Sequence, residues 1–429
     1  MVDTPNSDSR MTQIGRRPEF WVTYVTAWTV SLVAMFVRSQ YQQQDTWSNM
    51  VSFFSNEPPG NVTPECLPSP LGVHYFGDLV SWGCASLLKN PYRDSWGSAY
   101  FPLAYWVGKP FGWLLDYGLI AALFLFWAVF AAVIVMIWRI SKQIDSKELD
   151  NLIVWVIFTI ALSAPGIGLL DRGNGQVVVF LALLMWMFHE NRVERQYGAI
   201  WLGIAIAIKG YPIVFAVHYI RERQWKAFGT VALTASLGFV VPILTFEGSL
   251  TTSISSFLNQ LTSHVQSDGV VRYNSSLLGL FRVIEEVTDS GSTLLKPVNY
   301  LVTVAIRQYT IFSLALAVVL IAFTVSRSIK FFEFLVLCSV FCCLLVQVVG
   351  SYVLGLFWLP LLVACGWEEL NARRRVVLFG IALILVPKGL TFGSIGGVTP
   401  SLTTILNPVL MVLISIACCA PLAKRTHLS

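Results

Sequence analysis

The chain has 429 residues, 55% of them hydrophobic and 12% charged, with a mean hydropathy of +0.66. Soluble domains carry about 25% charged residues, so this composition excludes an ordinary soluble protein. Repeated apolar blocks, each about 15–22 residues long, predict a polytopic all-α membrane protein rather than an outer-membrane barrel. The net charge is +5, but the basic residues cluster at the ends of apolar blocks, so we expect no nucleic-acid partner.

The first apolar block covers residues 21–37 and lacks a following small-residue cleavage site, so we expect a retained signal anchor. The long polar segment after it contains Cys66 and Cys84, which could form a disulfide in an oxidising compartment. The segment FPLAYWVGKPFGWL is broken by proline and glycine, which favours a re-entrant or interfacial helix. The next clear span is 117–138. Further apolar blocks predict about ten to twelve transmembrane helices in one domain, residues 1–429; they begin near residues 152, 177, 199, 211, 227, 308, 331, 351, 376 and 403. Apart from Cys66 and Cys84, the cysteines lie in apolar segments, where they are typical of packing residues.

Residues 199–220 are long enough for one helix, but their centre reads Lys-Gly-Tyr-Pro. Proline and glycine both disfavour a continuous helix there. The segments on either side, ENRVERQYG and RERQWK, are both basic. Two half-crossings that meet at Lys209-Gly210 place both basic segments on one side, and we therefore expect a reversal at this point.

With this threading, most Lys and Arg residues of the short loops lie on the side of the N-terminus. The positive-inside rule then predicts an inner-membrane protein with residues 1–20 and the C-terminus in the cytoplasm. Segments 38–115 and 247–307 become extracytoplasmic loops, the first of them predicted to be catalytic.

Polar side chains gather on this predicted outer face, where ionisable groups near membrane depth mark substrate paths or catalytic sites. They come from four separate segments of the chain. The candidate site residues are His74, Asp78, Tyr92, Asp171, Arg172, Asn174, Gln176, Lys209, Tyr211, His264, Arg272 and Asn274.

Several of these residues also have a structural interpretation. Asp78 could be the N-cap of the helix LVSWGCASLL. Asp171 and Arg172 could form an ordinary loop ion pair, and Asn174 between two glycines could serve only a turn. The stem of Lys209 could snorkel along the bilayer.

Other chemistries lack their motifs. The sequence contains no nucleotide-binding phosphate loop, no Cys/His metal spacing and no Gly-x-Ser-x-Gly elbow. Asp78 has no acidic neighbour at a chelating spacing. We therefore expect no cofactor; a divalent metal stays open as an alternative, although the sequence gives it no support.

The segments GDLVSWGCASLLKNPYRDSWGSAYFPLAYW, GNGQVVVFLALLMW, GIAIAIKGYPIVFAVHYIRERQWKA and YNSSLLGLFRVI occur in this order. The ordered set resembles the C-type glycosyltransferases. Within them it resembles the polyprenyl-phosphate-sugar-dependent family of bacterial α-mannosyltransferases, glycosyltransferase family 87. The matching stretches lie between residue 76 and about residue 285.

This resemblance implies an inverting transferase with the GT-C fold that uses a lipid-phosphate sugar on the outer face. Asp78 matches the family's first-loop carboxylate and would be the general base. SYVLGLFWLP near residue 351 departs from the family because it lacks a His-Tyr pair, and the first loop carries a long insert.

The residues themselves agree with this chemistry. Transfer of a sugar to a hydroxyl needs a base, and a carboxylate in apolar surroundings is suited to that task. We expect Leu79, Trp82 and their aromatic neighbours to surround Asp78 in this way. Lys209, Arg172 and Arg272 are the cations available for the leaving phosphate, and the other candidate residues would shape the substrate site.

We therefore expect transfer of a hexose, mannose first, or of a pentofuranose from a polyprenyl-phosphate donor. The acceptor would be a glycolipid or a cell-envelope glycan. Two alternatives remain open. A lipid-linked sugar transporter or flippase also uses broken helices, although the sequence shows no internal repeat. An O-antigen polymerase or ligase would rely on outer-loop residues such as Arg272, Arg282 and His264.

Overall fold

The computed structural model confirms the all-α fold, because its regular elements are helices throughout the part of the chain that it describes. The described residues are 18–42, 76–94, 100–142, 157, 159–190, 195–268, 274–289, 296–326, 329–347, 349–365, 371–390 and 401–419. His74, Arg272 and Cys66 lie outside these ranges.

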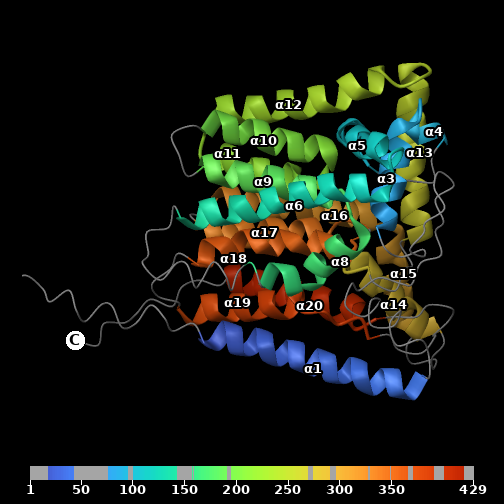
Figure 1. The fold of residues 1–429 in the computed structure, drawn as a ribbon. Helices are drawn as coiled ribbons and strands as arrows, with labels where there is room; N and C mark the ends of the chain where they lie inside the picture. Colours follow the sequence, from blue (N-terminus) through green and yellow to red (C-terminus); the bar gives the residue numbers. More distant parts are fainter. Residues whose placement is uncertain are drawn as a thin grey trace, which may run out of the picture.

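Most helices lie side by side with roughly parallel axes and form one bundle (Figure 1). The bundle consists of α1 (Pro18–Gln42), α6 (Leu119–Lys142), α8 (Ala164–Arg172), α9 (Gln176–Glu190), α10 (Arg195–Ile208), η2 (Tyr211–Ala216), α11 (Val217–Arg221), α12 (Trp225–Leu244), α16 (Tyr309–Ser326), α17 (Phe331–Leu344), η4 (Ser351–Phe357), α18 (Trp358–Cys365), α19 (Ala372–Leu385) and α20 (Leu402–Cys419).

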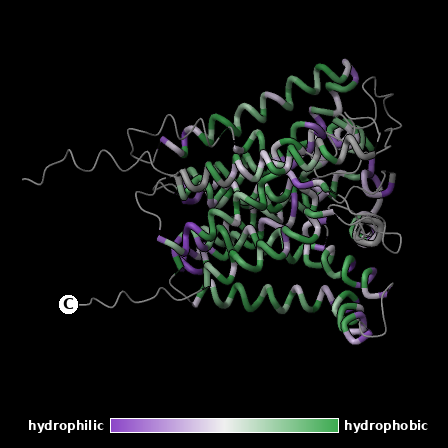
Figure 2. Tube along the Cα trace, turned by 90° about the horizontal axis from the view of Figure 1, so that it is seen from below, coloured by the Kyte–Doolittle hydropathy of each residue, from purple (hydrophilic) through white to green (hydrophobic). Residues whose placement is uncertain are grey.

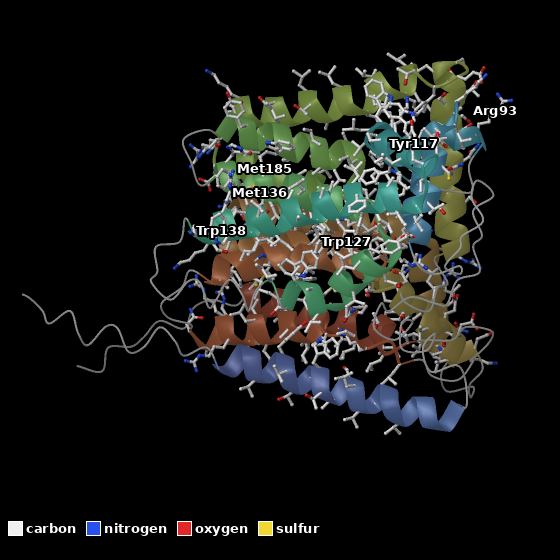
Figure 3. The ribbon with its side chains drawn as sticks, in the orientation of Figure 1. Arg93, Tyr117, Trp127, Met136, Trp138 and Met185 are labelled. Carbon is white, nitrogen blue, oxygen red and sulfur yellow. The ribbon has the colours of Figure 1, made fainter. Side chains whose placement is uncertain are left out.

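The remaining helices gather at one end of the bundle, on the right in Figure 1, which we call the cap end. They are α3 (Gly77–Leu87), α4 (Pro91–Asp94), α5 (Pro102–Leu115), α13 (Leu250–Asp268), α14 (Leu277–Asp289) and α15 (Lys296–Arg307). The described parts of the two predicted outer loops are therefore largely helical, and α13 runs across the ends of the bundle helices. Figure 3 shows the direction of α6, with Tyr117 at the cap end near Arg93 and Trp138 at the opposite end.

Four helices among the described residues are long and apolar enough to cross a membrane, namely α6, α12, α16 and α20. Shorter apolar helices, such as α9 and α17, lie beside them. Hydrophobic residues dominate the length of the bundle, and hydrophilic residues gather toward its two ends (Figure 2). The protein is therefore embedded in a membrane, whereas the number of crossings stays a prediction.

The predicted reversal at Lys209-Gly210 is confirmed by the packing of α10 against α12. A Cβ on Gly203 would lie 2.6 Å from the Cβ of Thr234, and a Cβ on Gly238 would lie 2.5 Å from that of Ala207. Both sequence numbers increase together along the contact, so the two helices are parallel. The chain between them must therefore return along the bundle, and one straight helix over 199–220 is excluded.

The returning segment is η2 followed by α11, and its helix type explains how so few residues span the distance. An α-helix rises about 1.5 Å per residue, whereas a 3₁₀-helix rises about 2.0 Å per residue, so the same number of residues covers a longer distance in 3₁₀ form. The 6 residues of η2 and the 5 of α11 therefore extend about 20 Å, close to the ~21 Å of the 14-residue α10.

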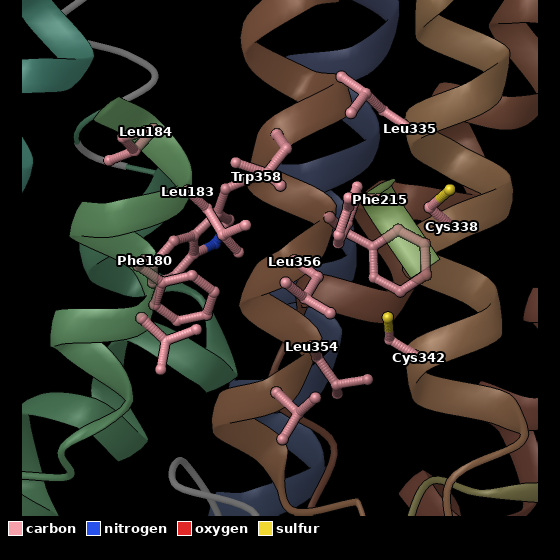
Figure 4. Packing of buried hydrophobic residues seen from close by; sticks show 14 of the residues in the cluster. Phe180, Leu183, Leu184, Phe215, Leu335, Cys338, Cys342, Leu354, Leu356 and Trp358 are labelled. Carbon is pink, nitrogen blue, oxygen red and sulfur yellow. The ribbon is translucent and has the colours of Figure 1, made fainter. Parts of the chain in front are cut away.

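The core of the bundle lies where α9, η4, α17 and α18 meet. Figure 4 shows Phe180 and Leu183 of α9 on one side of this core and Cys338 of α17 on the other. The Phe180 and Trp358 rings lie 4.8 Å apart between centroids. Truncation of such a buried aromatic side chain to alanine costs about 3–5 kcal/mol of folding free energy.

The packing interpretation is confirmed for four of the cysteines in the described residues. The thiols of Cys338, Cys342, Cys343 and Cys418 are free and buried, whereas Cys419 is free and exposed. Cys84 is disulfide-bonded; its predicted partner, Cys66, lies outside the described residues.

The α10–α12 contact gives a stability prediction. Gly238→Ala should lower the thermal unfolding midpoint in detergent, at a cost of about 1–3 kcal/mol, because the new methyl group meets Ala207, which has no rotamer to change. Gly229→Ala on the same helix is the control, since a Cβ there has nothing within 4 Å. The control should be neutral or slightly stabilising because alanine favours helix. Equal midpoints for the two variants would contradict this parallel contact.

Candidate active site

Asp78 lies in the first turn of α3, next to a backbone turn that few residues adopt. Phe76, the N-cap residue, has φ 56° and ψ 19°, in the left-handed region. Its N–H donates a hydrogen bond of 2.8 Å to the carbonyl oxygen of Asp171. The helix begins without a side-chain cap, so the interpretation of Asp78 as the N-cap is wrong. This turn instead joins the start of α3 to the end of α8.

The Asp78 carboxylate binds one side chain from the last residue of α8 and one from the turn that follows it. Its Oδ1 accepts a hydrogen bond from the Arg172 guanidinium at 3.0 Å, and its Oδ2 accepts one from the Asn174 amide at 2.6 Å. The side chains of Arg172 and Asp78 are 22% and 23% exposed. A cation and an amide therefore orient the carboxylate, in addition to the apolar neighbours expected from the sequence. Leu79 and Trp82 next to it are buried as expected.

Two glycines bring Asn174 to this position. Gly173 ends α8 with φ 64°, and a Cβ there would lie 2.7 Å from the Cβ of Leu79. A Cβ on Gly175 would lie 3.2 Å from the ring of Trp82. The Gly-Asn-Gly sequence is therefore needed because the chain approaches α3 closely at a left-handed residue.

The orientation of the Asn174 amide follows from its backbone contact. Its Oδ1 accepts a hydrogen bond from the N–H of Gln176 at 2.9 Å. The oxygen therefore faces the start of α9, and the amide nitrogen faces Asp78. Asn174 thus serves the turn that the sequence suggests and at the same time positions the carboxylate.

Lys209 lies near this network, on the other side of Tyr100. Its Nζ is 4.6 Å from the ring centroid of Tyr100 and 5.2 Å from that of Tyr352. The Tyr100 hydroxyl in turn lies 3.5 Å from Asn174 Oδ1, to which it donates a long hydrogen bond. Lys209 forms no ion pair with the residues that the structure describes. The reversal of the chain after α10 therefore holds a cation between aromatic rings, beside the Asp78 network.

The start of α9 adds an amide to the site. Gln176 is fully buried, and its Nε2 donates a hydrogen bond to the Tyr211 hydroxyl. Its buried Oε1 has no hydrogen-bond partner in the described part of the chain. Such an acceptor is available to a hydroxyl of a bound substrate.

In the described part of the chain, Tyr92 does not contact the Asp78 network directly but holds the backbone of Tyr100. Its side chain is buried between Tyr105, Phe246 and Phe257, and its hydroxyl donates a hydrogen bond of 2.9 Å to the carbonyl oxygen of Tyr100. Burial raises the pKa of this phenol well above its ordinary value, so it stays a neutral donor. The Asn-Pro-Tyr sequence is thus a structural anchor.

Asn274 also has a structural task in a different part of the cap end. Its amide donates to the carbonyl oxygen of Gln347 at 2.8 Å and accepts from the N–H groups of Ser276 and Val349. A Cβ on Gly279 would lie 2.5 Å from the carbonyl oxygen of Asn274. The Asn-Ser-Ser-Leu-Leu-Gly sequence therefore fastens the start of α14 to the loop before η4.

The other predicted residues are placed as follows. Asp171 contributes its backbone carbonyl to the Phe76 turn. His264 belongs to α13, and its side chain, like His74 and Arg272, lies outside what the structure describes.

Sequence reasoning missed Tyr100 and Tyr352 as site residues. Tyr100 belongs to the Tyr-Phe-Pro sequence of the first loop, so a signal was present. Tyr352 lies in SYVLGLFWLP, the segment noted only for its missing His-Tyr pair.

Candidate metal ligands do not gather around Asp78 in the described part of the chain. No group of three His, Cys, Asp or Glu side chains with suitable geometry occurs in the described ranges. The neighbours of the carboxylate are a guanidinium and an amide nitrogen, which do not ligate metals.

The sequence profile of glycosyltransferase family 87 matches residues 99–348, more than half of the chain. The chain belongs to glycosyltransferase family 87. The protein is therefore a membrane glycosyltransferase, and the resemblance seen in the sequence is confirmed. Arg172, Asn174 and Lys209 lie inside the match, and Asp78 lies before it.

One curated relative is GPI mannosyltransferase 1 of Eremothecium gossypii, 23% identical over 180 residues. The alignment covers 41% of this chain and 42% of that protein, so the likeness concerns less than half of either. No solved structure matches this glycosyltransferase.

The geometry predicts that Asn174 positions Asp78. Asn174→Ala should lower kcat for sugar transfer about 100-fold with a smaller change in KM, because a misplaced reacting group costs about that factor. Asn259→Ala is the control, since Asn259 is exposed on α13 at the same end. Steady-state kinetics on purified protein measure both effects. Wild-type kcat in Asn174→Ala would show that the amide is only part of the turn.

Proposed function

We propose that this glycosyltransferase moves a sugar from a polyprenyl-phosphate donor to a hydroxyl of a glycolipid or cell-envelope glycan. The observation that carries the proposal is the placement of Asp78 against Arg172 and Asn174, with Lys209 on the far side of Tyr100. A base and two cations from separate segments thereby share one site at the cap end. Sugar transfer with a phosphate leaving group needs these components.

In the proposed step, the acceptor hydroxyl oxygen attacks the anomeric carbon of the donor sugar. The bond from that carbon to the phosphate oxygen breaks, and polyprenyl phosphate leaves with the electron pair. The hydroxyl proton passes to the Asp78 carboxylate. A single displacement of this kind inverts the anomeric configuration. Each oxygen of Asp78 has one donor, Arg172 on Oδ1 and Asn174 on Oδ2. These two donors orient the base, and the proton is accepted on a remaining lone pair of the carboxylate.

The leaving phosphate requires positive charge where its own charge develops. Lys209 suits this task, since its ammonium group is held by ring faces rather than by a carboxylate in the described residues. Arg172 adds a guanidinium on the Asp78 side. Arg272 stays a proposed third cation. The free Oε1 of Gln176 is the proposed acceptor for a sugar hydroxyl, with Tyr211 beside it.

A lipid-linked donor is supported by the absence of a nucleotide-binding phosphate loop in the sequence. Mannose is favoured by the named activity of the Eremothecium relative, while glucose or a pentofuranose would meet the same residues.

The proposed orientation places the cap end outside the cell and both termini in the cytoplasm, in the inner membrane. It is supported by the charges at the opposite end, where α6 ends with Arg139 and Lys142 and α10 begins with Arg195. Positive residues in short connections favour the cytoplasm.

The test of the proposal is a transfer assay with purified protein, radiolabelled polyprenyl-phosphate sugars and a membrane glycolipid extract. Asp78→Asn should lower kcat about 10²–10⁴-fold, the usual contribution of a general base. Asp116→Asn, an exposed carboxylate at the same end, should leave transfer unchanged. Unchanged transfer in Asp78→Asn would remove Asp78 as base. Donor movement across vesicles without transfer would favour the transporter alternative.

Lys209→Met should raise the KM for the donor about 10-fold or more, because the cation is lost and the stem keeps its length. Lys209→Arg should recover part of the affinity, since it restores the charge. Lys109→Met is a matched control, because Lys109 also lies over an aromatic ring, that of Trp106, but outside the site. A donor KM that is equal in wild type and Lys209→Met would place the phosphate elsewhere.

A further inference from the structure

The helix α15 exposes large apolar residues, which is unusual for a helix on the surface of a soluble protein. None of its residues is buried, and its exposed side carries large apolar residues. Tyr300 is 71% exposed and Leu301 67%, with Val298 and Val304 beside them. A soluble helix turns such a face toward the protein core.

The polar side chains of α15 are used inside the protein. Thr303 donates a hydrogen bond of 2.9 Å to Glu285 of α14, and Asn299 contacts Asp289 of the same helix at 3.4 Å. The inner side of α15 thus combines these hydrogen bonds with the half-buried Val302 and Ile306, while large apolar residues are also left on the outer side. A partner less polar than water must cover it.

The neighbouring helix indicates which partner this is. The N–H of Gln308 donates to the carbonyl oxygen of Val304, and the N–H of Phe312 donates to that of Gln308. Helical hydrogen bonding thus passes from α15 into α16, a candidate membrane span. Ile311 and Phe312 are exposed on α16, so the apolar surface of α15 continues the surface that faces lipid.

The charges of α15 favour a lipid surface over a second copy of the chain. The helix contains no acidic residue, and its cations, Lys296 and Arg307, are exposed at its two ends. Pairing two copies of α15 in either direction would bring cations against cations, which is unfavourable. Lipid phosphates next to acyl chains fit both the cations and the apolar face.

We propose that α15 lies in the bilayer interface of the leaflet at the cap end. Its apolar face contacts acyl chains, and Lys296 and Arg307 contact lipid phosphates. Through α14, this contact also steadies the Asn274 loop, which binds the segment just before Tyr352.

The test uses the full chain in vesicles of phosphatidylcholine and phosphatidylglycerol, with an environment-sensitive fluorophore on Leu301→Cys. Leu314→Cys on α16, 62% exposed, is the lipid-facing control, and Asn259→Cys on α13 is the water-facing control. Labelling of the parent protein gives the background from native cysteines. Each variant must match the parent in size-exclusion profile and thermal midpoint before it is used.

Lipids brominated near the headgroup should quench the Leu301 label by about half, as for a probe at the acyl boundary, and leave the Asn259 label unaffected. Lys296→Gln with Arg307→Gln should reduce this quenching when phosphatidylglycerol is present. A Leu301 label that behaves like the Asn259 label would overturn the proposal. A label shielded without bromine quenching, in proportion to protein density, would show that a second copy covers the face.

Discussion

The ion pair between Asp78 and Arg172 is the constraint on which the rest of the candidate site depends. A carboxylate at the edge of an apolar bundle is costly unless cations and donors meet it. Arg172 and Asn174 meet both of its oxygens, and the two glycines around Asn174 exist because the chain must approach α3 closely. The left-handed Phe76, bound to the Asp171 carbonyl, completes the junction. A segment of the predicted first outer loop is thereby fixed to the helices that carry the rest of the candidate site.

The reversal after α10 supplies the second half of the site. Phe101 donates its N–H to the carbonyl oxygen of Ile208, and its ring fills the space beside Gly210. These contacts hold the first loop against the reversal, so Tyr100 lies between Asn174 and Lys209. An aromatic residue therefore contacts both the Asn174 side of the Asp78 network and the Lys209 ammonium group.

Sequence patterns predicted the features whose physics is local. The Lys-Gly-Tyr-Pro break, the closely spaced Arg172, Asn174 and Gln176, and the helical character of the chain follow from charge, proline and apolar length. Tyr352 was missed because only the folded bundle brings it beside Lys209. Tyr92 and Asn274 stay predicted substrate residues, and the structure shows both bound to backbone carbonyl groups. In a sequence, an isolated polar side chain looks the same whether it binds a ligand or a backbone group. The hydrogen bonds of Asp78 were not predicted, for a different reason: its partners, Arg172 and Asn174, are 94 and 96 residues away in the sequence.

The 3₁₀ form of η2 has a consequence for how the depth of the site is set. Tyr211 contacts Gln176 at one end of α9, while Tyr219 contacts Trp186 further along the same helix. Six residues are about 3 Å longer in 3₁₀ form than in α form, and this difference brings both contacts into register. The length of this segment therefore depends on both its number of residues and its helix type, and a change in one can offset a change in the other. A related chain with one or two more residues between α10 and α11 can keep its lysine at the same level by coiling them as an α-helix.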